Sequence, residues 1–171
     1  MHKRSFALGL PALALLAPWA INPAAAQDYP ARPITVVVPH PAGGSSDILA
    51  RQVSVELGKL LKQSVLVENK AGANGTIAAR YVASAPADGY TLLLATASTH
   101  GINPTLYRKL SYDAVKDFAP VTLLATVPNV LVVSRSAKTT TLQELVQDIR
   151  AKGDKANMGS AGAGTPGHLA G

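Results

Sequence analysis

The sequence contains no cysteine, and this absence excludes disulfide bonds, thiol nucleophiles and thiolate metal ligands. It is also poor in aromatic residues, with five tyrosines, two phenylalanines and one tryptophan in 171 residues. The charged residues are scattered along the chain, and the net charge is +6. Nucleic-acid binding needs a basic stripe or stacking aromatic side chains, so we expect no nucleic-acid partner. A mild positive charge instead favours the approach of small anions.

Motifs for nucleotide, zinc or acyl-transfer chemistry are missing as well. Neither glycine-rich stretch, at 43–44 or at 162–164, continues with the Gly-Lys-Ser/Thr of a phosphate-binding loop. The four histidines form no His-Glu-x-x-His pair, and there is no Gly-x-Ser-x-Gly nucleophile elbow. We therefore expect no enzyme, no metal site and no cofactor. An exported α/β enzyme and the ligand-sensing domain of a regulator remain as alternative interpretations.

The first 26 residues have the pattern of a secretory signal peptide. Residues 2–4 form a basic start, an apolar run extends to about residue 21, and three alanines at 24–26 offer a cleavage site before Gln27. An uncleaved membrane anchor is the alternative, but two prolines interrupt the apolar run. Export without cysteine is typical of a bacterial periplasmic protein. We therefore predict a signal peptide over residues 1–26 and a soluble protein in the periplasm.

The stretch from Ile34 to Asp47 combines a strand, a glycine turn and a helix start. The β-branched run Ile34–Val38 predicts a strand that is buried on both faces. Gly43-Gly44 predicts a turn, and the next three polar residues are candidate N-caps for a helix that ends near Lys62. The apolar face expected for this helix consists of Leu49, Val53, Leu57, Leu60 and Leu61. Such a helix start favours an anion, although the same spacing fits a structural turn without a ligand.

Strands and helices alternate after this stretch. Strands are expected at 65–69 and 91–96, and between them Thr76 is expected to cap a helix that runs to about Ala85. The alternation predicts an α/β fold with a parallel sheet. Ser98, Thr99 and, with less weight, His100 follow the third strand at the same carboxyl edge as the first glycine turn. They are candidate ligand contacts, but they could equally cap the short helix that comes next.

The last fifty residues contain a second glycine-rich loop. Further strands are expected at 122–126 and 129–134, and a short one at 156–159. Thr141 and Glu144 form a capping box, and the helix they open has an apolar face made of Leu142, Leu145, Val146 and Ile149. Residues 160–168 then lead from glycines into the first turn of a helix. Because a domain should not end on a first helical turn, we expect a truncated chain.

Several blocks of residues occur together and in order along the sequence. They are Tyr29-Pro-x-Arg-Pro-Ile34, Val38-Pro-x-Pro-Ala-Gly-Gly-Ser-Ser-Asp47, Val67-Glu-Asn-Lys70, Asp88-Gly-Tyr-Thr-Leu-Leu93, Asn103-Pro-x-Leu-Tyr107, Asp117-Phe-x-Pro-Val121 and Ser160-Ala-Gly-x-Gly-Thr165. As a set, they resemble the Bug-type extracytoplasmic solute receptors, which are the binding components of tripartite tricarboxylate transporters. The resemblance covers nearly the whole chain after the signal peptide.

The resemblance implies a periplasmic-binding-protein type II fold, in which two α/β lobes close on a small organic carboxylate. Residues 27–126 would form a nearly complete first lobe, and residues 127–171 would begin the second. Such receptors bind carboxylates through backbone N–H groups and ordered waters. The ligand-binding residues implied here are His40, Pro41, Ala42, Gly43, Gly44, Ser45, Asp47, Ser98, Thr99, Ser160, Ala161, Gly162, Gly164 and Thr165.

Two departures from the family pattern bear on these expectations. His40 stands where members of the family usually have phenylalanine, which adds a polar group to an apolar wall. Family members are also nearly twice as long as this chain. The resemblance further implies a monomer whose partners are the carboxylate and the membrane subunits of a tripartite transporter.

Overall fold

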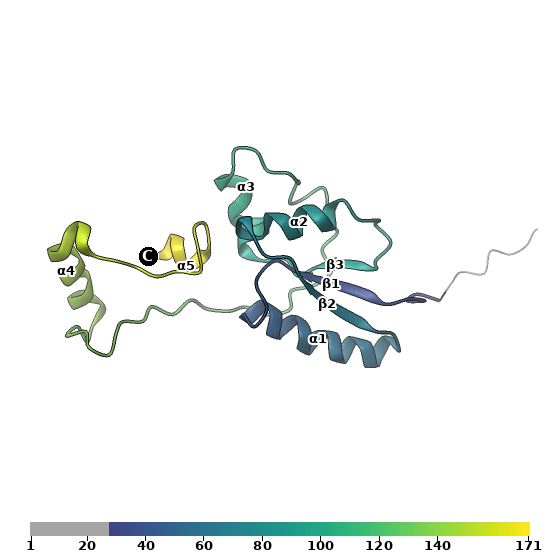
Figure 1. Cartoon of the computed structure of the whole chain (residues 1–171), viewed down its shortest axis with the longest axis horizontal. Helices are drawn as coiled ribbons and strands as arrows, with labels where there is room; N and C mark the ends of the chain where they lie inside the picture. The colour runs from purple at the N-terminus through teal and green to yellow at the C-terminus, as the bar shows by residue number, and fades with distance from the viewer. Residues whose placement is uncertain (1–27) are drawn as a thin grey trace, which may run out of the picture.

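A three-stranded parallel sheet forms the centre of the fold. The computed structural model describes residues 28–171, so the predicted signal peptide lies outside the described residues (Figure 1). The sheet consists of β1 (Ile34–Val38), β2 (Val65–Asn69) and β3 (Thr91–Leu93), in the order β2-β1-β3. Both β2 and β3 are parallel to β1. The predicted α/β fold with a parallel sheet is therefore confirmed.

Two helices cover opposite faces of this sheet (Figure 1). One crossover leads from β1 to one side through α1 (Ser45–Leu61), and the next leads from β2 to the other side through α2 (Thr76–Ala83). Since parallel crossovers are right-handed, strand order β2-β1-β3 places the two helices on opposite faces. The buried core comprises Val36, Val38, Ala50 and Leu94, with Val65, Val67 and Leu92 packed against it.

The helix α1 buries a slightly different face from the predicted one. Its buried residues are Asp47, Ala50 and Ser54, whereas Leu60 is 78% exposed. Consecutive residues are about 100° apart around a helix, so Leu60 points well away from its half-buried neighbour Leu61. The prediction was therefore wrong at Leu60. In α2, Thr76 is the first helical residue rather than the cap, a position that Gly75 takes.

The third strand is shorter than predicted. It ends at Leu93, although the Leu94 N–H still donates to the Val37 carbonyl (2.9 Å). The chain then enters a π-helix, η2 (Ala97–Ile102), which α3 (Asn103–Leu106) continues. The N-cap of η2 is Thr96, so this residue cannot also extend the strand.

The strands expected at 122–126, 129–134 and 156–159 do not form in the described part of the chain. These residues are in coil. The apolar side chains between residues 122 and 134 are exposed, with Leu123 82% and Val132 79% exposed. A strand needs backbone partners, and no strand within residues 28–171 pairs with these segments. The three strand predictions were therefore wrong.

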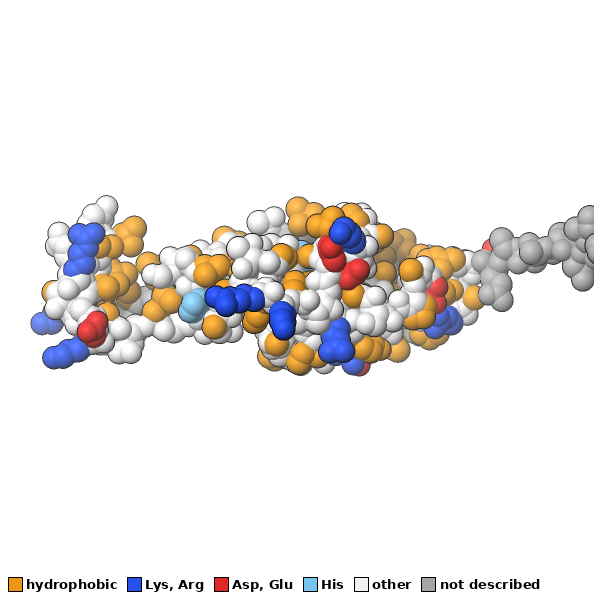
Figure 2. Space-filling model, turned by 90° about the horizontal axis from the view of Figure 1, so that it is seen from above, with side chains coloured by type: hydrophobic (Ala, Val, Ile, Leu, Met, Phe, Trp, Pro, Cys, Tyr) orange, Lys and Arg blue, Asp and Glu red, His pale blue; other side chains and the backbone are white. Residues whose placement is uncertain are grey.

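The remaining helices lie beyond this extended segment. The helix α4 (Leu142–Lys152) begins at the predicted capping box, because Thr141 and Glu144 each accept the other's backbone N–H at 3.2 Å. Its expected apolar face is largely exposed, as Figure 2 shows at the α4 end of the molecule. The chain then returns, and α5 (Pro166–Ala170) contacts η2. Short 3-10 turns occur at η1 (Ala73–Gly75) and η3 (Gly153–Lys155).

No helix within residues 28–171 is both long enough and hydrophobic enough to span a membrane. The predicted division into lobes after residue 126 remains a prediction.

Candidate functional site

The first glycine turn leaves the N-terminus of α1 without a side-chain cap. Gly43 has φ +84°, a left-handed conformation that glycine adopts readily. Gly44 is the N-cap in an extended conformation, and no side chain caps this helix end. Ser45, predicted as a cap, is instead the exposed first residue of α1. The first backbone N–H groups of a 17-residue helix therefore lack a side-chain cap beside the carboxyl end of β1.

The carboxylate of Asp47 holds this turn in place from inside. Asp47 is 3% exposed, and its Oδ2 accepts hydrogen bonds from the Gly43 N–H (2.9 Å) and Arg51 Nε (3.0 Å). Its Oδ1 accepts from Asn69 Nδ2 (3.0 Å) and forms an ion pair with Arg51 Nη2 at 3.0 Å. These contacts, first the Arg51 hydrogen bond and then those from Gly43 and Asn69, lower the pKa of Asp47 to about 2. Its acceptor positions are thus engaged within the protein, which indicates a positioning role for Asp47.

The same network fixes His40. Asn69 Nδ2 also donates to the His40 carbonyl (3.1 Å), and His40 Nδ1 lies 3.2 Å from Ser46 Oγ. Burial lowers the pKa of His40, so the neutral ring persists to a lower pH than in a free histidine. Pro41 and Ala42 are exposed and form the rim of the turn.

Ser98 and Thr99 are buried in η2. Thr99 Oγ1 accepts from the Thr96 N–H (3.0 Å), and the Thr96 side chain accepts from the Thr99 N–H (3.4 Å). Thr99 Oγ1 also lies 2.9 Å from His100 Nδ1, and burial lowers the pKa of His100. Thr99 thus caps η2 together with Thr96. The alternative drawn from the sequence was also a capping role, although for the short helix that follows. A ligand contact by Ser98 or Thr99 remains a prediction.

The second glycine loop has one exposed and one anchored end. Ser160, Ala161 and Gly162 are exposed, whereas Gly164 and Thr165 are buried. Thr165 caps α5, since its Oγ1 donates to the Gly162 carbonyl (2.7 Å) and accepts from the His168 N–H (3.4 Å).

A dipeptide after β2 connects the loops. Gly75 has φ +83°, and a Cβ atom there would lie 2.6 Å from Thr99 Cγ2 and 2.9 Å from Pro39 Cβ. The preceding Asn74 donates from Nδ2 to the Gly164 carbonyl (2.9 Å). No hydrogen bond within residues 28–171 joins the two glycine loops directly, so Asn74-Gly75 is the link between them.

Sequence reasoning missed the residues that hold these loops: Arg51, Asn69, Asn74, Asn103 and Tyr112. Asn103 is fully buried, and the Tyr112 hydroxyl donates to the Thr99 carbonyl at 2.5 Å. Asn74 had one recognisable sequence feature, because asparagine before glycine tolerates a left-handed backbone. The pairing of Asn103 with a residue 29 positions away had none.

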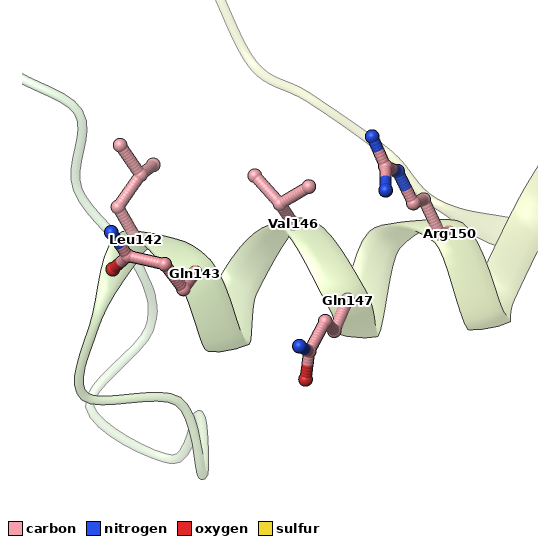
Figure 3. A pocket seen from close by; sticks show the side chains of 5 residues that line it. All are labelled: Leu142, Gln143, Val146, Gln147 and Arg150. Atoms are coloured by element: carbon pink, nitrogen blue, oxygen red, sulfur yellow. The ribbon is translucent and has the colours of Figure 1, made fainter.

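Two surface hollows include no residue of either glycine loop in their lining. One runs along α4 and is lined by Leu142, Gln143, Val146, Gln147 and Arg150 (Figure 3). The other is lined by Pro104, Leu110, Tyr112, Asp113 and Ala114. Figure 3 shows that a single helix provides the first hollow, which therefore lacks walls to enclose a ligand. We assign the candidate site to the loops. Within residues 28–171, no cluster of histidine, aspartate or glutamate could hold a metal ion.

Comparisons with known proteins agree on one family. The family described as Tripartite tricarboxylate transporter family receptor matches residues 49–171. A UPF0065 protein from Bordetella bronchiseptica is 43% identical over 176 residues, which cover 99% of this chain and 52% of that protein. The chain thus spans about half the length of the curated relatives it matches.

Solved structures give the same result. R. palustris Rpa4515 with adipate is 42% identical with a TM-score of 0.70, over 73% of this chain and 42% of that protein. MatC (Rpa3494) from Rhodopseudomonas palustris with bound malate is 40% identical with a TM-score of 0.68, over 72% of this chain and 42% of that protein. Two further solved relatives are described as periplasmic.

Proposed function

Because the chain belongs to the family of tripartite tricarboxylate transporter receptors, we propose that it forms the ligand-binding region of a periplasmic receptor for a small organic carboxylate. The observation that carries this proposal is the exposed, uncapped N-terminus of α1 beside the carboxyl end of β1. Backbone N–H groups and the positive end of the helix dipole meet at this position, and both favour an anion.

The first glycine turn binds one carboxylate of the ligand in this proposal. The Asp47 carboxylate occupies the Gly43 N–H, which leaves the N–H groups of Gly44, Ser45 and Ser46 as donors. Arg51 pairs with Asp47 and balances its negative charge, so the turn does not repel an incoming anion. Charge-assisted hydrogen bonds of this kind are shorter and stronger than neutral ones. His40, Pro41 and Ala42 line the approach to the donors.

The second glycine loop receives the other end of the ligand. Ser160, Ala161 and Gly162 are exposed, so their polar backbone groups are accessible, while Gly164 and Thr165 anchor the loop. Two loops at the ends of an elongated anion fit a dicarboxylate, which is the chemical class of the adipate and malate in the solved relatives. Buried Ser98 and Thr99 support the floor between the loops.

The remaining parts of the proposal concern the cellular setting. A signal peptide over residues 1–26 exports the chain, and residues after about 126 begin a second lobe. The receptor acts as a monomer and delivers its ligand to the membrane subunits of a tripartite transporter. It performs no chemistry on the ligand, so a bound dicarboxylate is recovered unchanged.

Calorimetric titration of the purified protein tests this proposal. Adipate and malate should bind, whereas the uncharged 1,6-hexanediol should not. Gly44→Val is the diagnostic variant, because a Cβ at Gly44 meets only the Pro41 carbonyl, at 3.5 Å, and the backbone is compatible with any residue. We expect dicarboxylate affinity to fall at least about tenfold, or about 1.4 kcal/mol, while the melting temperature is kept.

The matched control is Gly101→Val, since a Cβ at exposed Gly101 has no atom within 4 Å. This variant should bind as the parent protein does. Unchanged affinity in Gly44→Val, or a loss of affinity that parallels a loss of stability, would contradict the proposed site.

A further inference from the structure

We propose that Asn74 is a latch, a side chain whose hydrogen bond to Gly164 docks the second glycine loop onto the sheet-bearing part of the chain. This part comprises residues 34–93, which contain the three strands. The docking stands on geometry alone. Its consequence for ligand retention rests on the proposed function.

Both protons of the Asn74 amide are used, and they point to different parts of the chain. Asn74 Nδ2 donates to Asn103 Oδ1 (2.8 Å) and to the Gly164 carbonyl (2.9 Å). The second bond spans 90 residues. It therefore ties the turn after β2 to the loop before α5, and it is the only hydrogen bond between these two segments within residues 28–171.

Asn103 orients the Asn74 side chain. Asn103 is fully buried, and its Nδ2 donates back to the Asn74 carbonyl (2.9 Å) and to Thr76 Oγ1 (3.3 Å). Asn74 itself has φ +51° and ψ +39°, the left-handed conformation that asparagine tolerates. The side chain is thus held in place from two sides, so docking to Gly164 requires little further ordering.

The partner of the latch has to be a glycine. Gly164 has φ +77°, and a Cβ atom there would collide with the Leu106 side chain and lie 2.9 Å from Asn74 Nδ2. The close approach of the Gly164 carbonyl to Asn74 therefore depends on the missing side chain. Substitution at either residue should undo the same contact.

The contact is suited to opening and closing because it is incompletely satisfied. Asn74 Oδ1 is buried and has no hydrogen-bond partner within the part of the chain that the structure describes. A buried acceptor without a partner costs free energy, which offsets part of what the two donated bonds contribute. The exposed end of the loop, at Ser160, adds few contacts of its own. The docked arrangement is therefore weak enough to open.

Amide hydrogen exchange in Asn74→Asp tests the docking. Aspartate keeps the shape and tolerates the backbone, but it presents oxygen to the acceptors Asn103 Oδ1 and Gly164 O. Exchange should become at least tenfold faster over residues 162–169 and remain unchanged in β1. The matched control is Asn157→Asp, because the Asn157 amide donates only to the nearby Lys155 carbonyl (3.2 Å). It should leave both regions unchanged.

A second variant acts from the other side of the contact. Gly164→Ala should reproduce the faster exchange over residues 162–169 with β1 protected. If either variant leaves the loop exchange unchanged, or if Asn74→Asp also exposes β1, the latch is overturned.

Stopped-flow measurement with adipate tests the consequence for binding. Asn74→Asp should raise the adipate dissociation rate at least tenfold and change the association rate by less than threefold. If the parent protein binds no adipate while the exchange results hold, the proposed function fails and the docking stands. If adipate dissociates from Asn74→Asp at the parent rate, the role in retention is overturned.

Discussion

Two apolar segments of this chain have similar composition and opposite environments. β1 (Ile34–Val38) lies between two parallel strands, and Val37 and Val38 are 0% exposed. Residues 121–133 are equally rich in valine and leucine, yet Val130 and Val132 are 77% and 79% exposed. β1 has backbone partners on both edges, whereas the later segment has none among residues 28–171. An apolar run of this kind is suited to a buried strand. It forms one only where neighbouring strands pair with its backbone.

The largest difference between the two segments should appear when each loses a valine. Val38→Ala removes fully buried methyl groups from the core and should lower the free energy of unfolding by about 2 to 3 kcal/mol. Val132→Ala is the matched change in the exposed segment and should alter it by less than about 0.5 kcal/mol. Urea denaturation of both variants measures the contrast. Equal losses would mean that residues 121–133 are packed in solution.

Two glycines with positive φ, one packed and one not, extend this comparison of buried and exposed positions. Gly75 and Gly43 have nearly equal φ, +83° and +84°, but only Gly75 is packed, against Pro39 and Thr99. We expect Gly75→Ala to cost about 2 kcal/mol or more, since steric overlap adds to backbone strain. Gly43→Ala should cost only the strain, about 1 kcal/mol, because a Cβ there has no atom within 4 Å. Thermal unfolding of the two variants measures this difference. Equal losses of stability would contradict it.

The pH dependence of the sheet-bearing part should reveal the Asp47 network. The folded-state pKa of Asp47 is about 2, below its ordinary value of 3.8, so its contribution to stability is complete above about pH 4. That contribution is lost as the pH falls from about 4 through 2, because the carboxylate becomes protonated. Asp47→Asn should flatten the unfolding free energy over this range, and the exposed Glu56→Gln should not. A parent protein with no such decline would contradict the network.

The smallest effect is expected in α4, which is exposed and held by its own capping box. Thr141→Ala removes the side chain that accepts the Glu144 N–H and should destabilise this helix by about 1 kcal/mol. Amide exchange should accelerate in residues 142–152 only, with the global unfolding transition unchanged. Gln143→Ala, at the second residue of the helix, serves as the control. A shift of the global transition in Thr141→Ala would show that α4 packs against the rest of the chain.

These contrasts explain which structural features the sequence could predict. The strands β1 and β2 were predicted to the residue, because each is an apolar run bounded by prolines or turn residues. The capping box of α4 was predicted equally well, since it depends on residues three apart. The strands predicted at 122–126 and 129–134 do not form, because a strand depends on a partner that local sequence does not reveal. The burial predicted for Leu60 was also wrong, because a small change in the rotation of α1 about its axis decides which side chains are exposed.

In the candidate site, too, local features were predicted from the sequence and long-range contacts were not. Both glycine loops were found from sequence, since glycine between a strand and a helix is a local pattern. The residues that orient them were missed, because the contacts of Asn74 with Asn103 and Gly164 join positions 29 and 90 residues apart. Likewise, Asp47 was predicted as a ligand contact, and only the placement of Arg51 and Asn69 identifies its part in positioning the turn.

The strand order has a consequence for how the chain is made. β1 is synthesised first, yet it is the central strand, and its two partners begin only at Val65 and Thr91. Until the second of these leaves the ribosome, the apolar run of β1 has an unpaired edge, and forming a sheet from such distant segments is slow. The sheet at the centre of the fold can therefore be completed only after Leu93, the last residue of β3, has been synthesised.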